Sequence, residues 1–192
     1  AELDRIALLE TSERPLNACV ETLAESALEA ARTVDDKVKN KQPLGLLEGL
    51  PIVVKVNIDV KGALTTASTA ALKEWRPPSN APCVSKLVEA GAIVVARADM
   101  CELAVGFSGH SPAHGPCLNP RNPAINVGGS SSGTASSVAA GVAADVLGSV
   151  PARPPRTHGI GTQPHESQDS ALATDCLLLL GHVALRIPLP TI

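Results

Sequence analysis

The fold of this chain is decided by the stretch VSKLVEAGAIVVA, residues 84–96. Residues 84–90 have the pattern of a helix that Gly91 ends, and residues 92–96 are a continuous apolar run. A second such run, rich in β-branched residues, spans residues 50–54. A buried strand, a helix and another buried strand with short connections predict a parallel α/β sheet.

Helices are expected around this core. Two helical stretches open the chain, and the second has apolar residues at helical spacing over residues 16–34. We further expect a short helix over residues 99–105, a largely buried helix over residues 134–147 and a helical segment over residues 171–187. The predicted fold class is therefore α/β, with a mixed, largely parallel sheet flanked by helices.

The 192 residues are sufficient for one domain with a buried core. We divide it into N-terminal helices (residues 1–44), a core (45–150), a Pro-rich junction (151–164) and a C-terminal helix segment (165–192). Aromatic residues make up only 1% of the chain, namely Trp75 and Phe107. The core must therefore be built from Ala, Val, Leu and Ile.

Composition argues against several classes of function. The formal net charge is −3 and the sequence has no basic stripe, so neither nucleic acid nor an anionic membrane is an expected partner. No purely apolar stretch of the sequence, residues 176–180 included, is long enough to span a membrane. Five scattered cysteines fit a reducing compartment, and no secretory leader opens the chain. We expect a cytoplasmic protein.

Two features indicate a site for amide chemistry. Lys55 directly follows the apolar run 50–54, where burial could lower its pKa and make it a base. Residues 128–133 read GGSSSG, in which serine hydroxyl groups lie between glycines that allow tight turns. Amide hydrolysis requires a nucleophile, a base for its proton and donors for the oxyanion. A metal site at His110, His114 and Cys117 is not predicted, because no fourth ligand has suitable spacing.

These motifs resemble those of the amidase signature family. The pattern Gly-x-Pro-x-x-x-Lys occurs over residues 49–55, and the glycine–serine loop and a helix rich in small residues follow it. Lys55 and Ser130 are 75 residues apart, a separation similar to that in the family. The resemblance covers residues of roughly 15 to 150, and several motifs in the same order are far more specific than one loop alone. Further similar stretches are residues 62–66, 87–92, 101–104, Gly115, and Asn119 with Pro120.

The resemblance implies roles for individual residues. Lys55 would be the general base, and Ser130, after a cis peptide bond from Gly129, would relay the proton. Ser149 aligns with the nucleophile. The remaining site residues would form the substrate and oxyanion loop, namely Gly128, Gly129 and Ser131. The resemblance implies a small-molecule amide substrate and neither a metal nor an organic cofactor; it leaves the oligomeric state open.

The chain also departs from the family pattern. The alignment of Ser149 implies a deletion of roughly five residues before it, at the turn that supplies oxyanion donors. Val56 stands where an acidic residue is usual. We therefore expect an internally deleted, truncated relative with an incomplete amidase fold, and two interpretations remain open. One is an amide hydrolase that uses a Ser-Ser-Lys triad, and the other is a catalytically inactive amidase-like binding or scaffold protein, or a truncated product.

Overall fold

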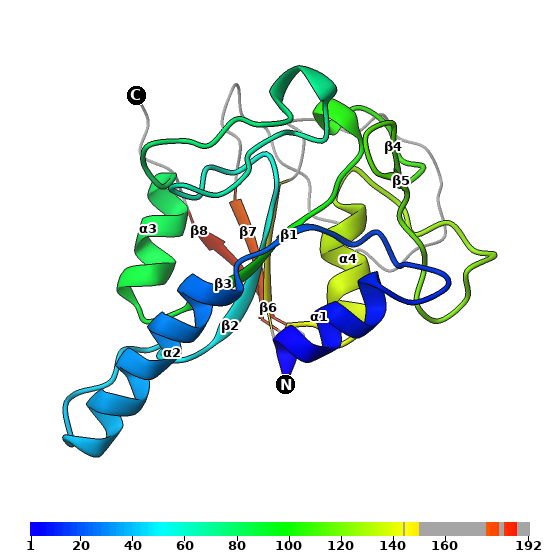
Figure 1. Ribbon diagram of the computed structural model, residues 1–192. Helices are drawn as coiled ribbons and strands as arrows, with labels where there is room; N and C mark the ends of the chain where they lie inside the picture. The colour runs from blue at the N-terminus through cyan, green and yellow to red at the C-terminus, as the bar shows by residue number, and fades with distance from the viewer. Residues whose placement is uncertain (144, 150–175, 181–182, 188–192) are drawn as a thin grey trace.

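The computed structural model describes residues 1–143, 145–149, 176–180 and 183–187. A six-stranded sheet forms the centre, with helices on its faces (Figure 1). The helices, in chain order, are α1 (Glu2–Glu10), α2 (Ala24–Lys39), the 3₁₀ turn η1 (Ala70–Leu72), α3 (Pro82–Glu89), the 3₁₀ turn η2 (Glu102–Ala104) and α4 (Ser132–Ala139). The strands are β1 (Cys19–Thr22), β2 (Pro51–Lys55), β3 (Ile93–Ala98), β4 (His110–Ser111), β5 (Gly115–Pro116), β6 (Asp145–Ser149), β7 (Cys176–Leu180) and β8 (Val183–Ile187).

The main sheet has the strand order β1-β3-β2-β6-β7-β8. Its three central strands are parallel, because β2 pairs in parallel with both β3 and β6. Strands β1, β7 and β8 are antiparallel to their neighbours, and β4 with β5 forms a separate small ribbon. The predicted mixed sheet flanked by helices is thus confirmed, with its parallel part at the centre.

The alternation of side chains along β2 separates two hydrophobic clusters. Ile52 and Val54 pack with Val84 and Leu87 of α3. Val53 faces the opposite way and packs in the second cluster, with Ile6 of α1 among its members. Figure 1 shows α3 and α4 on opposite sides of the central strands. Because successive strand residues point to opposite faces, Lys55 lies on the same face as Val53, the face that α4 covers.

The core contains no aromatic side chain among the described residues. Trp75 is 50% exposed and Phe107 is 51% exposed, whereas Ile52, Val53, Val54 and Leu147 are fully buried. The prediction of a core made of Ala, Val, Leu and Ile is therefore confirmed.

The local prediction around β2 and β3 is also confirmed. The apolar runs 50–54 and 92–96 correspond to strands β2 and β3, and the helix expected over residues 84–90 is α3. The helix expected over residues 16–34 is wrong in its first part, because residues 19–22 form β1 and α2 begins only at Ala24. Pairing of β1 with the edge of β3 outweighs the helical spacing of the apolar residues there.

Two longer helices were predicted where the structure has strands. Helix α4 ends at Ala139, Gly141 takes a positive φ of 65°, and residues 145–149 form β6 instead of continuing the helix. Within the segment 171–187, the described residues form β7 and β8. In both places runs of small or branched apolar residues suit either structure, and pairing in the sheet decides between them.

The short helix predicted over residues 99–105 is reduced to the 3₁₀ turn η2. Leu103 and Ala104 have positive φ values of 50° and 61°, which an α-helix does not allow. The predicted Pro-rich junction over residues 151–164 lies outside the described residues, as does most of the predicted C-terminal segment 165–192.

Candidate active site

Lys55 is the last residue of β2 and its side chain is fully buried. Its backbone pairs with Ala98 at the end of β3. The next residue extends this pairing, since Val56 N donates to Ala98 O at 3.0 Å. The lysine therefore stands at the carboxyl edge of the parallel strands, the edge at which open α/β sheets carry their sites.

The glycine–serine loop brings Ser130 to this lysine. Lys55 Nζ donates a hydrogen bond of 2.9 Å to Ser130 Oγ, and Ser130 is only 3% exposed. The Gly129–Ser130 peptide bond is cis, as the resemblance implied. The structure thus joins two residues 75 positions apart in a buried contact.

Glycine is required at both positions before Ser130, for different reasons. Gly128 has a φ of 83°, and its N–H donates to Asn126 Oδ1 at 2.6 Å, which closes a tight turn. A Cβ atom on Gly129 would lie 2.7 Å from Cys101 Sγ and 3.1 Å from Gly106 O. Gly128 therefore shapes the loop, and Gly129 allows it to approach the segment that follows β3.

The same segment holds the loop through its main chain. Cys101 N donates to Ser130 O at 3.0 Å, and Gly133 N donates to Asp99 O at 3.0 Å. These two hydrogen bonds bracket Ser131 and Ser132, where α4 begins. Ser130 is consequently fixed from both sides of the loop.

Burial changes the acid–base behaviour of Lys55. Desolvation lowers the pKa of Lys55 to about 8, and the nearby Cys101 thiol acts weakly in the opposite direction. An amine with such a pKa is partly neutral near physiological pH, and only the neutral form accepts a proton. Lys55 can therefore serve as a base, with Ser130 Oγ as its immediate partner.

We expect the Lys55 side chain to titrate with a midpoint near pH 8, well below the ordinary lysine value of about 10.4. Heteronuclear NMR of the lysine Cε and Nζ signals between pH 6 and 11 measures this midpoint. The Lys55→Met variant identifies the signal, because that signal alone disappears from its spectrum. A midpoint above pH 10 would show that the ammonium form is not disfavoured.

The third predicted catalytic residue, Ser149, is the last residue of β6. Because β6 runs parallel to β2 with Leu147 opposite Val54, Ser149 and Lys55 belong to the same edge of the sheet. The preceding Gly148 lies beside the loop, since a Cβ atom there would be 3.5 Å from Ser131 Oγ. Ser149 is part of a regular strand pair with Cys176 rather than of a turn.

Sequence reasoning missed Asp99 and Ser68. Both are buried, and Ser68 Oγ donates to Asp99 Oδ1 at 2.5 Å. Cys101, expected only as part of the similar stretch 101–104, also lies against the glycine–serine loop, since its amide donates to Ser130 O and its Sγ would lie 2.7 Å from a Cβ atom on Gly129. The sequence does hold a signal for Asp99, which is a polar residue close after a predicted buried strand. Such a residue lies at the same edge of the sheet as Lys55, which ends the neighbouring strand.

The described part of the chain holds neither a cluster of metal-ligating side chains nor a helix that could span a membrane. Its His, Cys, Asp and Glu side chains form no group of three or more that could hold a metal ion, and this includes His110, His114 and Cys117. Among its helices, none combines the length and apolar character needed to cross a bilayer.

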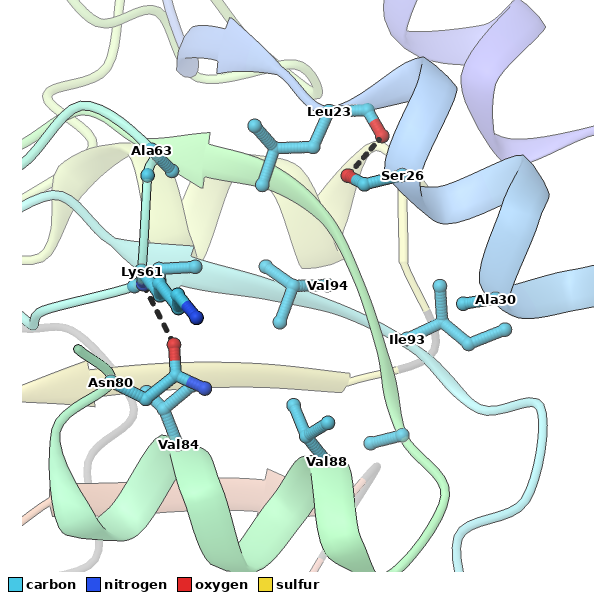
Figure 2. A pocket seen from close by; sticks show the side chains of 13 residues that line it. Leu23, Ser26, Ala30, Lys61, Ala63, Asn80, Val84, Val88, Ile93 and Val94 are labelled. Carbon is cyan, nitrogen blue, oxygen red and sulfur yellow. Dashed lines mark hydrogen bonds between the residues drawn. The ribbon is translucent and has the colours of Figure 1, made fainter. Parts of the chain in front are cut away.

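A surface pocket of about 380 Å³ lies away from this site, between α2, α3 and β3 (Figure 2). It is bordered by Leu23 and Ser26 on one side and by Val84 and Val88 of α3 on the other. Neither Lys55 nor Ser130 lines it. The hydroxyl that does line it, Ser26 Oγ, donates to Leu23 O at 3.2 Å.

Comparison with known proteins identifies the family of this architecture. Residues 3–149 match the sequence profile of the Amidase family. The chain is 38% identical over 136 residues to a glutamyl-tRNA(Gln) amidotransferase subunit of Salinispora tropica, and the match covers 69% of this chain and 27% of that protein. It is 39% identical over 131 residues to an indoleacetamide hydrolase of Bradyrhizobium diazoefficiens, and this match covers 68% of this chain and 24% of that protein.

The fold leads to the same family. The peptide amidase of Stenotrophomonas maltophilia superimposes with a TM-score of 0.73 at 34% identity, and the match covers 78% of this chain and 31% of that enzyme. The chain thus spans about a quarter of the length of the curated relatives it matches. Sequence profile, relatives and fold agree, and the chain belongs to the amidase family.

Proposed function

We propose that the chain hydrolyses the carbon–nitrogen bond of a small-molecule amide by a Ser-Ser-Lys mechanism. The observation that carries this proposal is the buried hydrogen bond of 2.9 Å between Lys55 Nζ and Ser130 Oγ. A lysine whose pKa burial lowers to about 8 is a competent base at that position. Membership of the amidase family supplies the reaction class.

The proposed steps balance without a cofactor. Ser149 Oγ attacks the amide carbon while its proton passes through Ser130 Oγ to Lys55 Nζ. The proton then returns by the same route to the leaving amine as the carbon–nitrogen bond breaks, which leaves an ester on Ser149. Water then attacks this ester and passes a proton through Ser130 Oγ to Lys55 Nζ, and the proton returns to Ser149 Oγ as the acid leaves.

The glycine–serine loop is the proposed substrate contact. Gly129 is exposed beside the buried Ser130, and Ser131 lies next to Gly148 and hence near the end of β6. Gly128 has its N–H engaged with Asn126, so its role is to shape the loop. The cytoplasmic location and the lack of nucleic-acid or membrane partners rest on sequence composition and stay predictions.

A specific observation favours a second candidate function, that of a catalytically inactive binding or scaffold protein. Strand β6 continues through Ser149 and pairs with Cys176, where the family resemblance leads one to expect a turn with oxyanion donors. Loss of one such donor typically slows the reaction by a factor on the order of 10²–10³. In that case the Lys55–Ser130 contact is an inherited structural feature.

A fluorophosphonate probe separates these functions. We expect its phosphorus to bind Ser149 Oγ with loss of fluoride, and mass spectrometry of the digested protein to locate the adduct. Labelling should disappear in Ser149→Ala and fall at least tenfold in Lys55→Met, because the base that activates the hydroxyl is lost. Ser26→Ala, which removes an exposed hydroxyl on α2, is the matched control and should label like the unmodified chain.

If the protein unfolds cooperatively, never labels and hydrolyses no simple amide, the hydrolase function is refuted and the binding or scaffold function remains. Non-cooperative unfolding without labelling would instead indicate a truncated product that lacks a stable fold.

A further inference from the structure

A buried carboxyl group lies where β3 ends, next to the glycine–serine loop. Asp99 follows Ala98, the residue paired with Lys55, and is fully buried. Its Oδ1 accepts the hydrogen bond of 2.5 Å from Ser68 Oγ, while Oδ2 has no hydrogen-bond partner among the described residues. Over the same part of the chain, no Lys, Arg or His forms an ion pair with Asp99. Burying a carboxyl oxygen without a hydrogen-bond partner costs free energy, so this arrangement needs a structural or functional explanation.

The main chain beside Asp99 carries the loop that contains Ser130. Asp99 O accepts from Gly133 N, and two residues later Cys101 N donates to Ser130 O, both at 3.0 Å. Asp99 N in turn donates to Ala18 O at 2.8 Å, which ties the segment to the residue before β1. Any displacement of residues 99–101 therefore displaces Ser130 relative to Lys55.

Ser68 connects this segment to the other side of Lys55. Ala67 N donates to Val56 O at 3.2 Å, directly after the lysine, and Leu103 N donates to Ala67 O at 2.9 Å. Ala67 and Ser68 both have positive φ values, 47° and 53°, a conformation that favours glycine. The hydroxyl–carboxyl contact thus joins a strained turn next to Lys55 to the segment that holds Ser130.

We propose that Asp99 and Ser68 are a positioning pair that holds Ser130 Oγ within hydrogen-bond distance of Lys55 Nζ. Their contact fixes residues 99–101, and the two main-chain hydrogen bonds transmit this fixed position to the loop. The catalytic value of the pair rests on the proposed hydrolase function, but its effect on the loop does not. Neither side chain takes part in the proposed chemical steps.

The surroundings of Asp99 raise the pKa of its carboxyl group. The ionisable groups that face it are Glu10 of α1, the thiols of Cys19 and Cys117, and His110 and His114 of the small ribbon. Burial raises the pKa of Asp99, and the hydrogen bonds from Ser68 and from the Met100 amide offset this only in part. An asparagine has the same shape and keeps a side-chain oxygen that can accept the hydrogen bond from Ser68 Oγ, so it should support the loop as well as the aspartate does.

Amide hydrogen exchange followed by NMR tests the pair without any need for turnover. Gly133 and Cys101 report on the two loop hydrogen bonds, and Ile93, whose N donates to Leu50 O at 2.8 Å, is the reference at the far end of β3. In Ser68→Ala and Asp99→Ala we expect exchange of the Gly133 and Cys101 amides to accelerate at least tenfold relative to Ile93. In Asp99→Asn the three amides should exchange as in the unmodified chain.

Rescue by Asp99→Asn distinguishes positioning from a general loss of stability. Equal acceleration at all three amides, or exchange in Asp99→Asn as fast as in Asp99→Ala, would overturn the proposal. If Asp99→Ala does not fold, Ser68→Ala and Asp99→Asn still give opposite expected results at the same two amides. A chain that never labels with the fluorophosphonate probe but shows this exchange pattern would refute the hydrolase and keep the positioning pair.

Discussion

Replacing Lys55 by methionine is expected to lower amide hydrolysis by a factor on the order of 10²–10⁴, the usual contribution of a general base. The replacement removes the amine that hydrogen-bonds to Ser130 Oγ. Methionine is close to lysine in length and apolar, so the buried position stays filled. Steady-state hydrolysis of a simple amide, measured between pH 6 and 10, gives the effect. The rate of the unmodified chain should rise with pH to a plateau above about 8.

The same substitution should raise stability at neutral pH. Burial lowers the pKa of Lys55 from 10.5 to about 8 in the folded chain, which corresponds to about 3 kcal/mol against the charged form. Below pH 8 the folded chain carries the full cost of holding the charged amine. The cost shrinks as the pH rises toward 10.5, the pKa of Lys55 in the unfolded chain, because the unfolded chain then also loses the proton. The loss of the Ser130 hydrogen bond subtracts about 1 kcal/mol from the gain.

Urea unfolding of both proteins at pH 7 and pH 10 measures this difference. The advantage of Lys55→Met should be larger at pH 7 than at pH 10. An equal or larger advantage at pH 10 would mean that Lys55 is not desolvated in the folded chain. Lys37→Met is a matched control. Lys37 lies in the last turn of α2, is partly exposed and forms an ion pair with Glu48.

How far the sequence predicts this fold depends on how local the determining interactions are. Strands β2 and β3 and helix α3 follow from continuous apolar runs, a helical segment and a glycine at its end, all within neighbouring residues. Strand β6 could not be predicted in this way, because Val146 and Leu147 are apolar in either structure. Their place beside Val53 and Val54 in the sheet makes them a strand.

The residues of the site also differ in whether the sequence alone predicts them. Lys55 and Ser130 were predicted from motifs whose order and spacing resemble those of a family, and the structure places them in contact. Asp99 and Ser68 belong to no such motif in the sequence analysis, and 31 residues separate them. Only the folded chain shows that the Asp99 carboxyl group and the Ser68 hydroxyl group meet next to the glycine–serine loop, because their contact depends on the path of residues 56–68.

Gly133→Ala is expected to destabilise the fold by about 2–4 kcal/mol, since overpacking and a lost hydrogen bond act together. A Cβ atom at this position would overlap Ala18 O and would lie 2.5 Å from Asp99 N and 2.6 Å from Asp99 O. All three are backbone atoms, so no side chain can rotate away to make room. The start of α4 must instead move away from β3, which breaks the hydrogen bond from Gly133 N to Asp99 O.

Gly148→Ala is the matched control for this steric argument. Its nearest neighbours would be side-chain atoms of Ser131 and Thr134 at 3.5–3.8 Å, which is ordinary contact. Alanine also suits a strand better than glycine, so its stability should change by less than about 1 kcal/mol. Urea unfolding of both variants compares them directly. A small effect at Gly133 would show that α4 is not held tightly against residues 18 and 99, and the loop would then be free to carry Ser130 away from Lys55.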